Sequence, residues 1–165
     1  MQRERNRPIL KTSADAMVNR LSKGRHVVAE HPLTSEAFDQ DEMKGLDPYF
    51  KSGQLMKVAG YGCDVGYCDE FGQPYQKRFC IVTDMPAVAN LVMNTRCNHP
   101  GIAHSRCLGG SHTKRAAEWP AGLDILVIHG NEQQLALDNE SIYAVFAYPA
   151  TADPEDIERR TPPRV

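Results

Sequence analysis

The sequence lacks long hydrophobic runs and the short motifs that mark several enzyme classes. No apolar stretch approaches the roughly 18 residues of a membrane-spanning helix, and the basic first residues lack the apolar core of a secretory signal. The sequence contains no P-loop pattern, no G-x-G-x-x-G after a strand, no G-x-S-x-G and no H-E-x-x-H. We therefore expect a cytoplasmic or nuclear protein that is not secreted, has no membrane partner and belongs to none of these motif-defined classes.

Cysteine is scarce and odd in number. The five cysteines are Cys63, Cys68, Cys80, Cys97 and Cys107. An odd count in a chain without a secretory signal argues against a disulfide framework. We expect these cysteines to be free thiols or metal ligands.

An excess of one charge is also missing, but the charges are unevenly distributed. The net charge is −2, although residues 1–25 and 77–115 each carry net +5 while 26–76 and 116–165 each carry net −6. The two basic blocks could form one face that attracts a polyanion. The alternative is an alternating, solvated surface.

The length of 165 residues, with 41% apolar and 24% charged residues, is typical of one globular domain. Alternating helix and strand patterns predict an α/β fold: a single domain with a mixed or mostly parallel sheet flanked by helices, and two long loops rich in Cys, Gly and His. We expect a basic arm over 1–11, the domain over 12–150 and a disordered tail over 151–165. Helices are predicted at 12–23, 34–46, 86–94 and 120–129, and strands at 25–30, 54–59, 77–83 and 141–148.

A short apolar strand is predicted to end at an acid and an imidazole. Glu30, His31 and Pro32 follow Val27, Val28 and Ala29 directly. Ligands of open α/β sheets bind beyond the carboxyl ends of strands, where a glutamate can hydrogen-bond a substrate or move a proton. Glu30 and His31 are therefore candidate catalytic residues. The alternative is that Glu30 caps a neighbouring helix and His31 is exposed.

A loop rich in cysteine and histidine follows the predicted helix at 86–94. Two thiolates and two imidazoles are the ligands that tetrahedral zinc binds, which makes a zinc site a candidate cofactor site. The candidate ligands are Cys97, His99, His104 and Cys107, with Cys63 and Cys68 as candidate distal ligands. The spacing C-x-H-x4-H-x2-C matches no common zinc finger. Alternatively, the histidines contact solvent, phosphate or backbone.

The stretch GGSHTKRAAEWP places two glycines before a run of hydrogen-bond donors. His112, Lys114 and Arg115 could contact a phosphate or a nucleic-acid backbone. The alternative is a helix N-terminus with a polar first turn.

Four stretches, taken in order, resemble the C-terminal half of cytosine-5 DNA methyltransferase-like modules of the viral, phage and retrotransposon type. They are GRHVVAEHPLTSEAF, GYCDEFGQPYQKRFCIVTDMP, CNHPGIAH followed by LGG, and TKRAAEWPAGL. The resemblance covers about residues 20–130. It implies that Glu30 holds the ring nitrogen of a target cytosine, and that Lys77 and Arg78 meet phosphate.

The resemblance also implies what the chain would need from elsewhere. The nucleophilic cysteine and the S-adenosylmethionine loop of such modules lie upstream, and no cysteine precedes Glu30. The chain alone is therefore not expected to methylate DNA. It would bind S-adenosylmethionine and act as an enzyme only when completed by another segment, with DNA and a complementing chain as partners.

Three functions follow from these observations. The first is a methyltransferase-derived domain that binds nucleic acid or completes a split cytosine-5 DNA methyltransferase. The second is a zinc-stabilised binding domain or small enzyme that uses the loop from Cys97 to Cys107. The third is a structural protein of a virus or mobile element.

Overall fold

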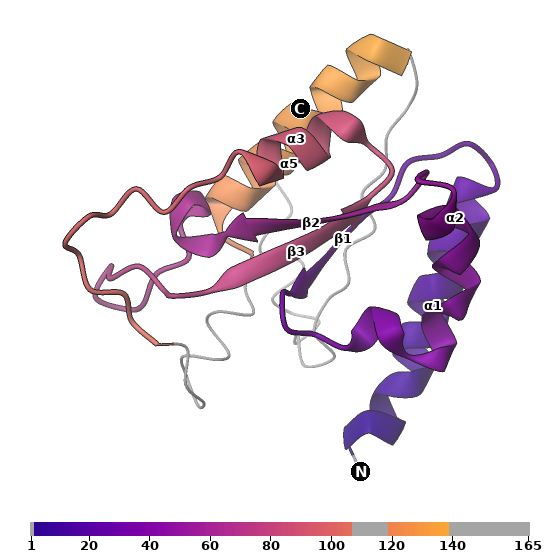
Figure 1. Ribbon diagram of the computed structural model, residues 1–165, viewed down its shortest axis with the longest axis horizontal. Helices are drawn as coiled ribbons and strands as arrows, with labels where there is room; N and C mark the ends of the chain where they lie inside the picture. The colour runs from indigo at the N-terminus through magenta and orange to yellow at the C-terminus, as the bar shows by residue number, and fades with distance from the viewer. Residues whose placement is uncertain (1, 107–118, 139–165) are drawn as a thin grey trace, which may run out of the picture.

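A computed structural model of the chain describes residues 2–106 and 119–138 (Figure 1). Within this part, the chain forms four α-helices, three strands and three 3-10 turns. The helices are α1 (Gln2–Leu21), α2 (Asp47–Lys51), α3 (Pro86–Met93) and α5 (Ala121–Asp138). The strands are β1 (Val28–Pro32), β2 (Met56–Tyr61) and β3 (Arg78–Thr83), and the 3-10 turns are η1 (Ala37–Asp39), η2 (Asp41–Leu46) and η3 (Gly62–Val65). The prediction of a single α/β domain is confirmed at this level.

The prediction of a mixed or mostly parallel sheet is wrong. The strands lie in the order β1-β3-β2, and both β1 and β2 pair with β3 in the antiparallel sense. A parallel pair needs a long crossover connection, usually a helix. The connection from β2 to β3 contains only η3 and a loop, so β3 returns antiparallel beside β2.

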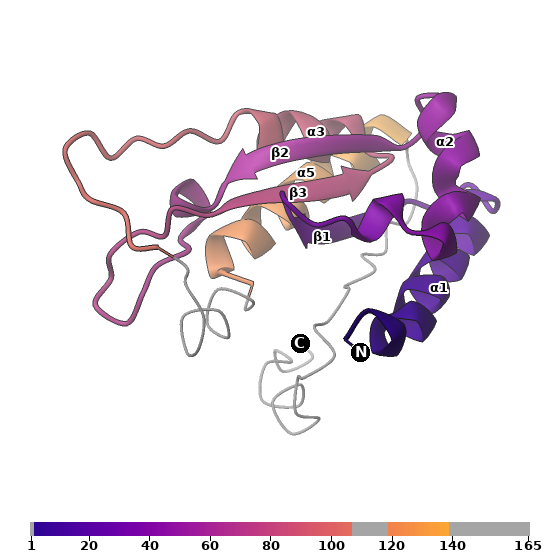
Figure 2. The same cartoon turned by 60° about the horizontal axis from the view of Figure 1, so that its bottom comes forward.

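Helices pack on both faces of the sheet (Figures 1 and 2). Side chains alternate between the two faces along each strand. The α5 face, covered by α3 and α5, contains Val28, Ile81 and Val58 at matching register positions. The α1 face, packed against α1 and η2, contains Ala29 and Val82. The central strand β3 is buried from Phe79 to Thr83, which explains its continuous apolar sequence.

The first helix begins earlier than the sequence pattern indicates. Residues 2–11, expected to form a basic arm, are the first half of α1. Pro8 lies inside this helix, where its missing N–H removes one backbone hydrogen bond. The Thr12 hydroxyl donates to the Pro8 carbonyl at 2.9 Å. The buried side chains of Ala14, Met17 and Leu21 anchor the second half of α1.

The segment expected to form one helix over 34–46 is instead divided between η1 and η2. Gln40 interrupts it with an extended backbone (ψ 151°). Asp47 and Pro48, expected to end that helix, begin α2, because proline suits the first turn of a helix, where its missing N–H is not needed.

The strand predicted over 25–30 is shifted to Val28–Pro32, so Glu30 and His31 lie within β1 and not beyond it. Pro32 is tolerated because β1 is an edge strand of the described sheet.

The last described helix is longer than its predicted range of 120–129. Gly130 lies inside α5 at a close approach to α3. A Cβ atom at this position would lie 2.8 Å from a Val88 methyl group, so glycine permits this packing. The predicted strand at 141–148 and the tail at 151–165 lie outside the described residues. Among the helices of the described part, none has both the length and the apolar content needed to cross a membrane.

Candidate metal centre

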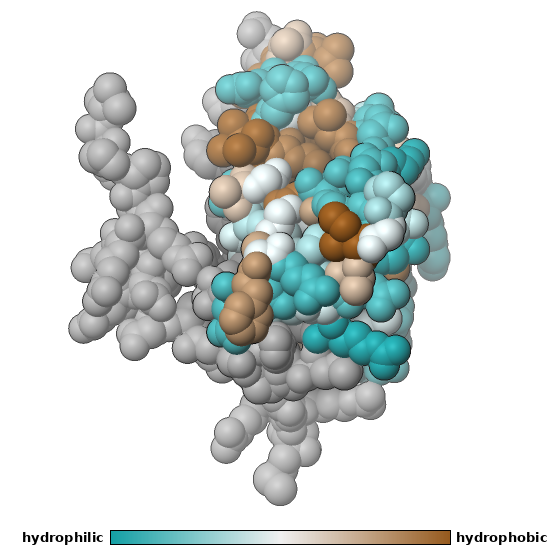
Figure 3. Space-filling model, turned by 90° about the vertical axis from the view of Figure 1, so that its left-hand side faces the viewer, coloured by the Kyte–Doolittle hydropathy of each residue, from teal (hydrophilic) through white to brown (hydrophobic). Residues whose placement is uncertain are grey.

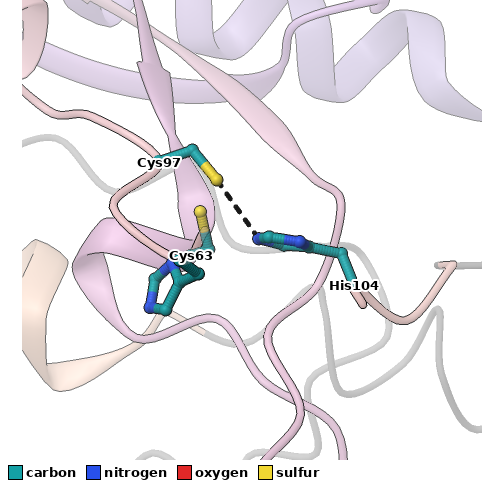
Figure 4. A group of neighbouring side chains, drawn as sticks. Cys63, Cys97 and His104 are labelled. Carbon is teal, nitrogen blue, oxygen red and sulfur yellow. Dashed lines mark hydrogen bonds between the residues drawn. The ribbon is translucent and has the colours of Figure 1, made fainter. Parts of the chain in front are cut away.

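Four side chains with metal-binding atoms meet at one end of the sheet. Cys63 lies in η3, and Cys97, His99 and His104 lie in the loop that follows α3. Their ligand atoms all lie within 4.8 Å of one another. The Cys97 and Cys63 sulfurs and the His104 ring point toward a common region, with Cys97 Sγ 3.3 Å from His104 Nε2 (Figure 4). We call these four residues the ligand group.

The turn η3 positions Cys63. The Gly62 N–H donates to the Lys77 carbonyl at 2.8 Å, and the Tyr67 N–H donates to the Gly62 carbonyl at 3.0 Å. A Cβ atom at Gly62 would lie only 2.8 Å from the Lys77 carbonyl oxygen, so a larger residue would displace this turn. Gly66 ends η3 at φ 94°, a backbone conformation that glycine adopts without strain. The glycines around Cys63 therefore have a structural role in the site.

Two hydrogen bonds join η3 to the segment that carries Cys97. The Tyr61 N–H donates to Thr95 Oγ1 at 2.9 Å, and the Arg96 N–H donates to Asp64 Oδ2 at 3.0 Å. The buried Thr95 hydroxyl donates in turn to the Val92 carbonyl at 2.8 Å. These bonds lie on both sides of Cys63 and directly before Cys97, so the two thiols are brought together by groups other than a metal.

The buried carboxylate of Asp69 holds the segment that carries His104. Asp69 Oδ1 accepts hydrogen bonds from the Phe71 and Gln73 N–H groups, both at 2.9 Å. The Ser105 hydroxyl donates to Asp69 Oδ2 at 2.5 Å, and the Ser105 N–H donates to the Pro74 carbonyl at 2.8 Å. The loop after His104 is therefore fixed to the hairpin-like segment before β3.

The protonation of Cys63 in the ligand group depends on whether a metal ion is bound. Burial, followed by the neighbouring Cys97 thiol, raises the pKa of Cys63 to about 11. Without a cation beside it, the Cys63 sulfur therefore disfavours the thiolate form. A divalent cation reverses this preference, because it binds thiolates and releases their protons.

The donor set fits a tetrahedral ion. Donor atoms around zinc are about 3.3–3.8 Å apart, so atoms already within 4.8 Å need only small movements to reach it. His99 Nδ1 is buried and has no hydrogen-bond partner, which is the state of a nitrogen that a metal ion would satisfy. His99 and His104 meet edge to face, with ring centroids 5.6 Å apart. The described residues thus contain a Cys2His2 group that could hold a metal such as zinc.

Three of the four predicted loop ligands belong to this group. Cys97, His99 and His104 are brought together as expected, whereas Cys107 lies outside the described residues. Cys63, predicted only as a candidate distal ligand, completes the group. Cys68, the other distal candidate, is exposed and is not part of it. The ends of β2 and α3 meet in space, and spacing along the chain does not reveal that contact.

The two predicted catalytic residues lie on opposite faces of the sheet. Glu30 pairs in register with Ile81 on the α5 face. His31 pairs with Cys80 on the α1 face, where its Nδ1 lies 3.2 Å from the Ser35 hydroxyl and its ring meets Phe38 edge to face. A carboxylate and an imidazole on opposite faces do not form one shared site.

The Glu30 carboxylate lies in an apolar environment. Burial raises its pKa, and the opposing effects of the Lys77 charge and a Trp119 hydrogen bond are smaller. Glu30 Oε1 and the Tyr67 hydroxyl are both buried without a hydrogen-bond partner. Burial, then the negative charges of Glu30 and Asp124, raises the pKa of Tyr67. This arrangement leaves polar atoms available on the α5 face.

The predicted nucleic-acid contacts are only partly described. Lys77 Nζ lies 4.0 Å from the Tyr67 ring centroid, beside Glu30, and Arg78 Cζ lies 4.7 Å from the Tyr61 ring centroid. His112, Lys114 and Arg115 lie outside the described residues.

No protein-family model, curated protein or solved structure matches the chain. The case for a function therefore depends on the geometry of the site.

Proposed function

We propose that the chain is a binding module stabilised by a structural zinc ion at Cys63, Cys97, His99 and His104. The observation that carries this proposal is the convergence of four ligand atoms within 4.8 Å from η3 and a distant loop. Catalytic zinc sites keep one coordination position open for water or substrate, whereas four protein ligands fill a tetrahedral shell. The complete donor set favours a structural role over a hydrolytic one.

The surroundings of the ligand group support the same role. The segments over 66–77 and 94–106 have no helix or long strand of their own, and only hydrogen bonds and isolated bridges connect them. A metal ion joining Cys63 to His104 would link both segments to the end of the sheet. In small domains, the free energy of metal binding contributes directly to the free energy of folding.

Metal analysis of the purified protein tests this proposal. We expect one zinc ion per chain after purification in zinc-containing medium, and a cobalt-loaded form with thiolate-to-cobalt charge-transfer absorption. Cys97→Ser and Cys63→Ser should lose the metal, whereas Cys68→Ser, a matched exposed thiol, should keep it. Cys107→Ser separates the two candidate ligand sets: full zinc content supports Cys63 as the fourth ligand. A folded chain that takes up no zinc or cobalt would exclude the proposal.

We also propose a second function, the completion of a split cytosine-5 DNA methyltransferase. One observation favours it: a buried Glu30 carboxylate with an unpaired oxygen on the α5 face, which is suited to hydrogen-bonding a nucleobase in a dry pocket. The test mixes the chain with the upstream half of such an enzyme, with its nucleophile and S-adenosylmethionine site, and measures labelled methyl transfer to DNA. Transfer that Glu30→Ala abolishes supports this function. Absence of transfer from a folded, associated mixture contradicts it.

A further inference from the structure

The α1 face of the sheet is covered only in part. Near one end, Ala29, Cys80 and Val82 are buried beneath α1, α2 and their connecting turns. Toward the end that carries the ligand group, the same face presents larger polar and aromatic side chains that are half-buried or exposed. These residues are His31 from β1, Arg78 from β3, Tyr61 from β2 and Phe38 from η1 at the rim, together with Lys57, which pairs with Val82 at the covered end of β2 and reaches Phe38 with its ammonium group. We call them the open half-face.

The strands give this face a positive character. Lys57 and Arg78 are exposed on it, and His31 adds an ionisable imidazole. Glu30 is the only acidic residue in β1, β2 and β3, and its register position places it on the opposite face. The strand residues of the open half-face therefore include cations and no carboxylate. Such a surface is complementary to an anionic ligand.

Flat aromatic and guanidinium groups are also placed on the open half-face. Tyr61 and Arg78 are directly opposite in the β2–β3 register, and the guanidinium carbon lies 4.7 Å from the Tyr61 ring centroid. On the other side, the Phe38 ring lies 5.1 Å from the His31 ring, and Lys57 Nζ lies 5.6 Å from the Phe38 centroid. The first group stands on β2 and β3, and the second joins β1 and η1 to the Lys57 side chain of β2.

We propose that the open half-face binds single-stranded nucleic acid, with bases stacked on Tyr61 and Arg78 and on the Phe38–His31 pair, and with Lys57 facing a phosphate. Bases stack on aromatic rings and on arginine planes when they are unpaired, which a flat sheet surface permits and a duplex does not. The inference rests on the proposed binding module, because Tyr61 directly precedes η3 and its N–H donates to Thr95 beside the ligand group.

Fluorescence anisotropy with labelled oligo-U RNA, oligo-dT DNA and a matched duplex tests the proposal, with zinc content measured in every sample. We expect binding of the single strands over the duplex, and affinity that falls from about 50 to about 200 mM salt. Tyr61→Ala should weaken binding about 5- to 100-fold, whereas Tyr61→Phe should retain it. Lys57→Ala should weaken binding to all sequences and reduce the salt slope by about one ion.

Matched controls come from outside the open half-face. Phe71→Ala removes an aromatic ring that is 86% exposed in a loop, and Lys51→Ala removes a cation in α2; both should bind as the unaltered chain does. Preference for the duplex, or unchanged binding by folded Tyr61→Ala and Lys57→Ala, overturns the proposal. If a zinc-loaded chain binds no oligonucleotide, the open half-face proposal fails while the zinc proposal stands. If the chain folds without zinc, the zinc proposal fails. Oligonucleotide binding by that zinc-free chain still tests the open half-face proposal.

Discussion

The two ends of the sheet differ in the contacts that accompany apolar burial. At the α1 end, apolar side chains from α1, η2 and two strands are buried together, among them Met17, Leu46 and Val82. At the end with the ligand group, apolar side chains such as Tyr75 and Phe79 are also buried, and hydrogen bonds to Thr95, Asp64 and Asp69 and the four ligand side chains are added to them. That end is viewed directly in Figure 3, where many hydrophilic residues (teal) accompany hydrophobic ones (brown). Both ends are therefore stabilised by burial, and the loops at the ligand-group end depend in addition on polar contacts that a metal ion can complete.

Removal of the metal should have the largest effect and should be confined to one end. Chelation of zinc, or Cys63→Ala, removes an interaction that contributes about 10 kcal/mol or more in small zinc domains. We expect hydrogen exchange measured by mass spectrometry to accelerate over 62–76 and 95–105, and to change little in the second half of α1. A uniform acceleration of hydrogen exchange across the chain would contradict a metal dependence confined to the ligand-group end.

Truncation of a core side chain should affect the opposite end. Leu46 is fully buried against α1, so Leu46→Ala should lower the free energy of unfolding by about 2–5 kcal/mol through lost burial and a cavity. Urea denaturation measures this change, and zinc content should stay at its original value in the folded state. Leu137→Ala is the control, because Leu137 is 73% exposed and its truncation should change stability by less than about 0.5 kcal/mol.

Loss of the Asp69 carboxylate should weaken zinc binding as well as stability, because its hydrogen bonds hold the segment that carries His104. Asp69→Ala leaves the Phe71 and Gln73 N–H groups without their acceptor, and leaves the Ser105 hydroxyl with Gln73 Oε1 in place of the carboxylate. We expect a loss of about 1–3 kcal/mol in stability and weaker zinc binding, measured by competition with a chromophoric chelator. Glu70→Ala, at the exposed neighbouring position, should change neither quantity. Equal zinc affinity in both variants would show that Asp69 does not position His104.

The buried Glu30 should make stability fall as the pH rises. Burial raises the pKa of Glu30 above its ordinary value of 4.5, so the folded chain holds this proton more tightly than the unfolded chain. Its favourable contribution is complete below pH 4.5 and is lost as the pH rises through the folded-state pKa. Glu30→Gln should therefore exceed the unaltered chain in stability at neutral pH, and urea titrations should show the difference shrinking toward acid pH. A variant less stable at every pH would contradict this.

His31, on the other face, should have the opposite and smallest pH dependence. Burial, then the Lys57 charge, lowers the pKa of His31 below its ordinary value of 6.5. The neutral form contributes stability that is fully present above pH 6.5 and is lost as the pH falls through the folded-state pKa. We expect His31→Gln to flatten the decline in melting temperature between neutral and mildly acidic pH. An unchanged slope would exclude His31 as its source.

The sequence predicts those elements of the fold that local pattern determines. The strand over 77–83 and the helix over 86–94 coincide closely with β3 and α3, because an apolar run and a Pro at the first helical turn are local signals. The sequence pattern does not predict the antiparallel pairing, because alternating helices and strands favour parallel crossovers. The strand positions of Glu30 and His31 depend on register, and a shift of two residues moved both from the strand end into the strand.

The sequence likewise predicts only the locally encoded part of the candidate metal centre. Three ligands within eight residues, Cys97, His99 and His104, were recognised from residue type alone. The choice of the fourth ligand depends on which distant segment meets them, and this is fixed by hydrogen bonds such as Asp64 to Arg96. Similarly, the open half-face joins residues from η1 and all three strands, so no contiguous motif marks it.

The bonds from Tyr61 to Thr95 and from Asp64 to Arg96 also have a consequence for the timing of assembly. During synthesis, Cys63 leaves the ribosome before His104, and the chain between them forms β3 and α3 in the folded protein. We expect a four-coordinate ion to be captured after β3 and α3 have formed, because these elements separate Cys63 from Cys97 along the chain. Metal capture would act as a checkpoint late in folding, and nascent chains truncated before residue 97 should acquire no zinc at this position.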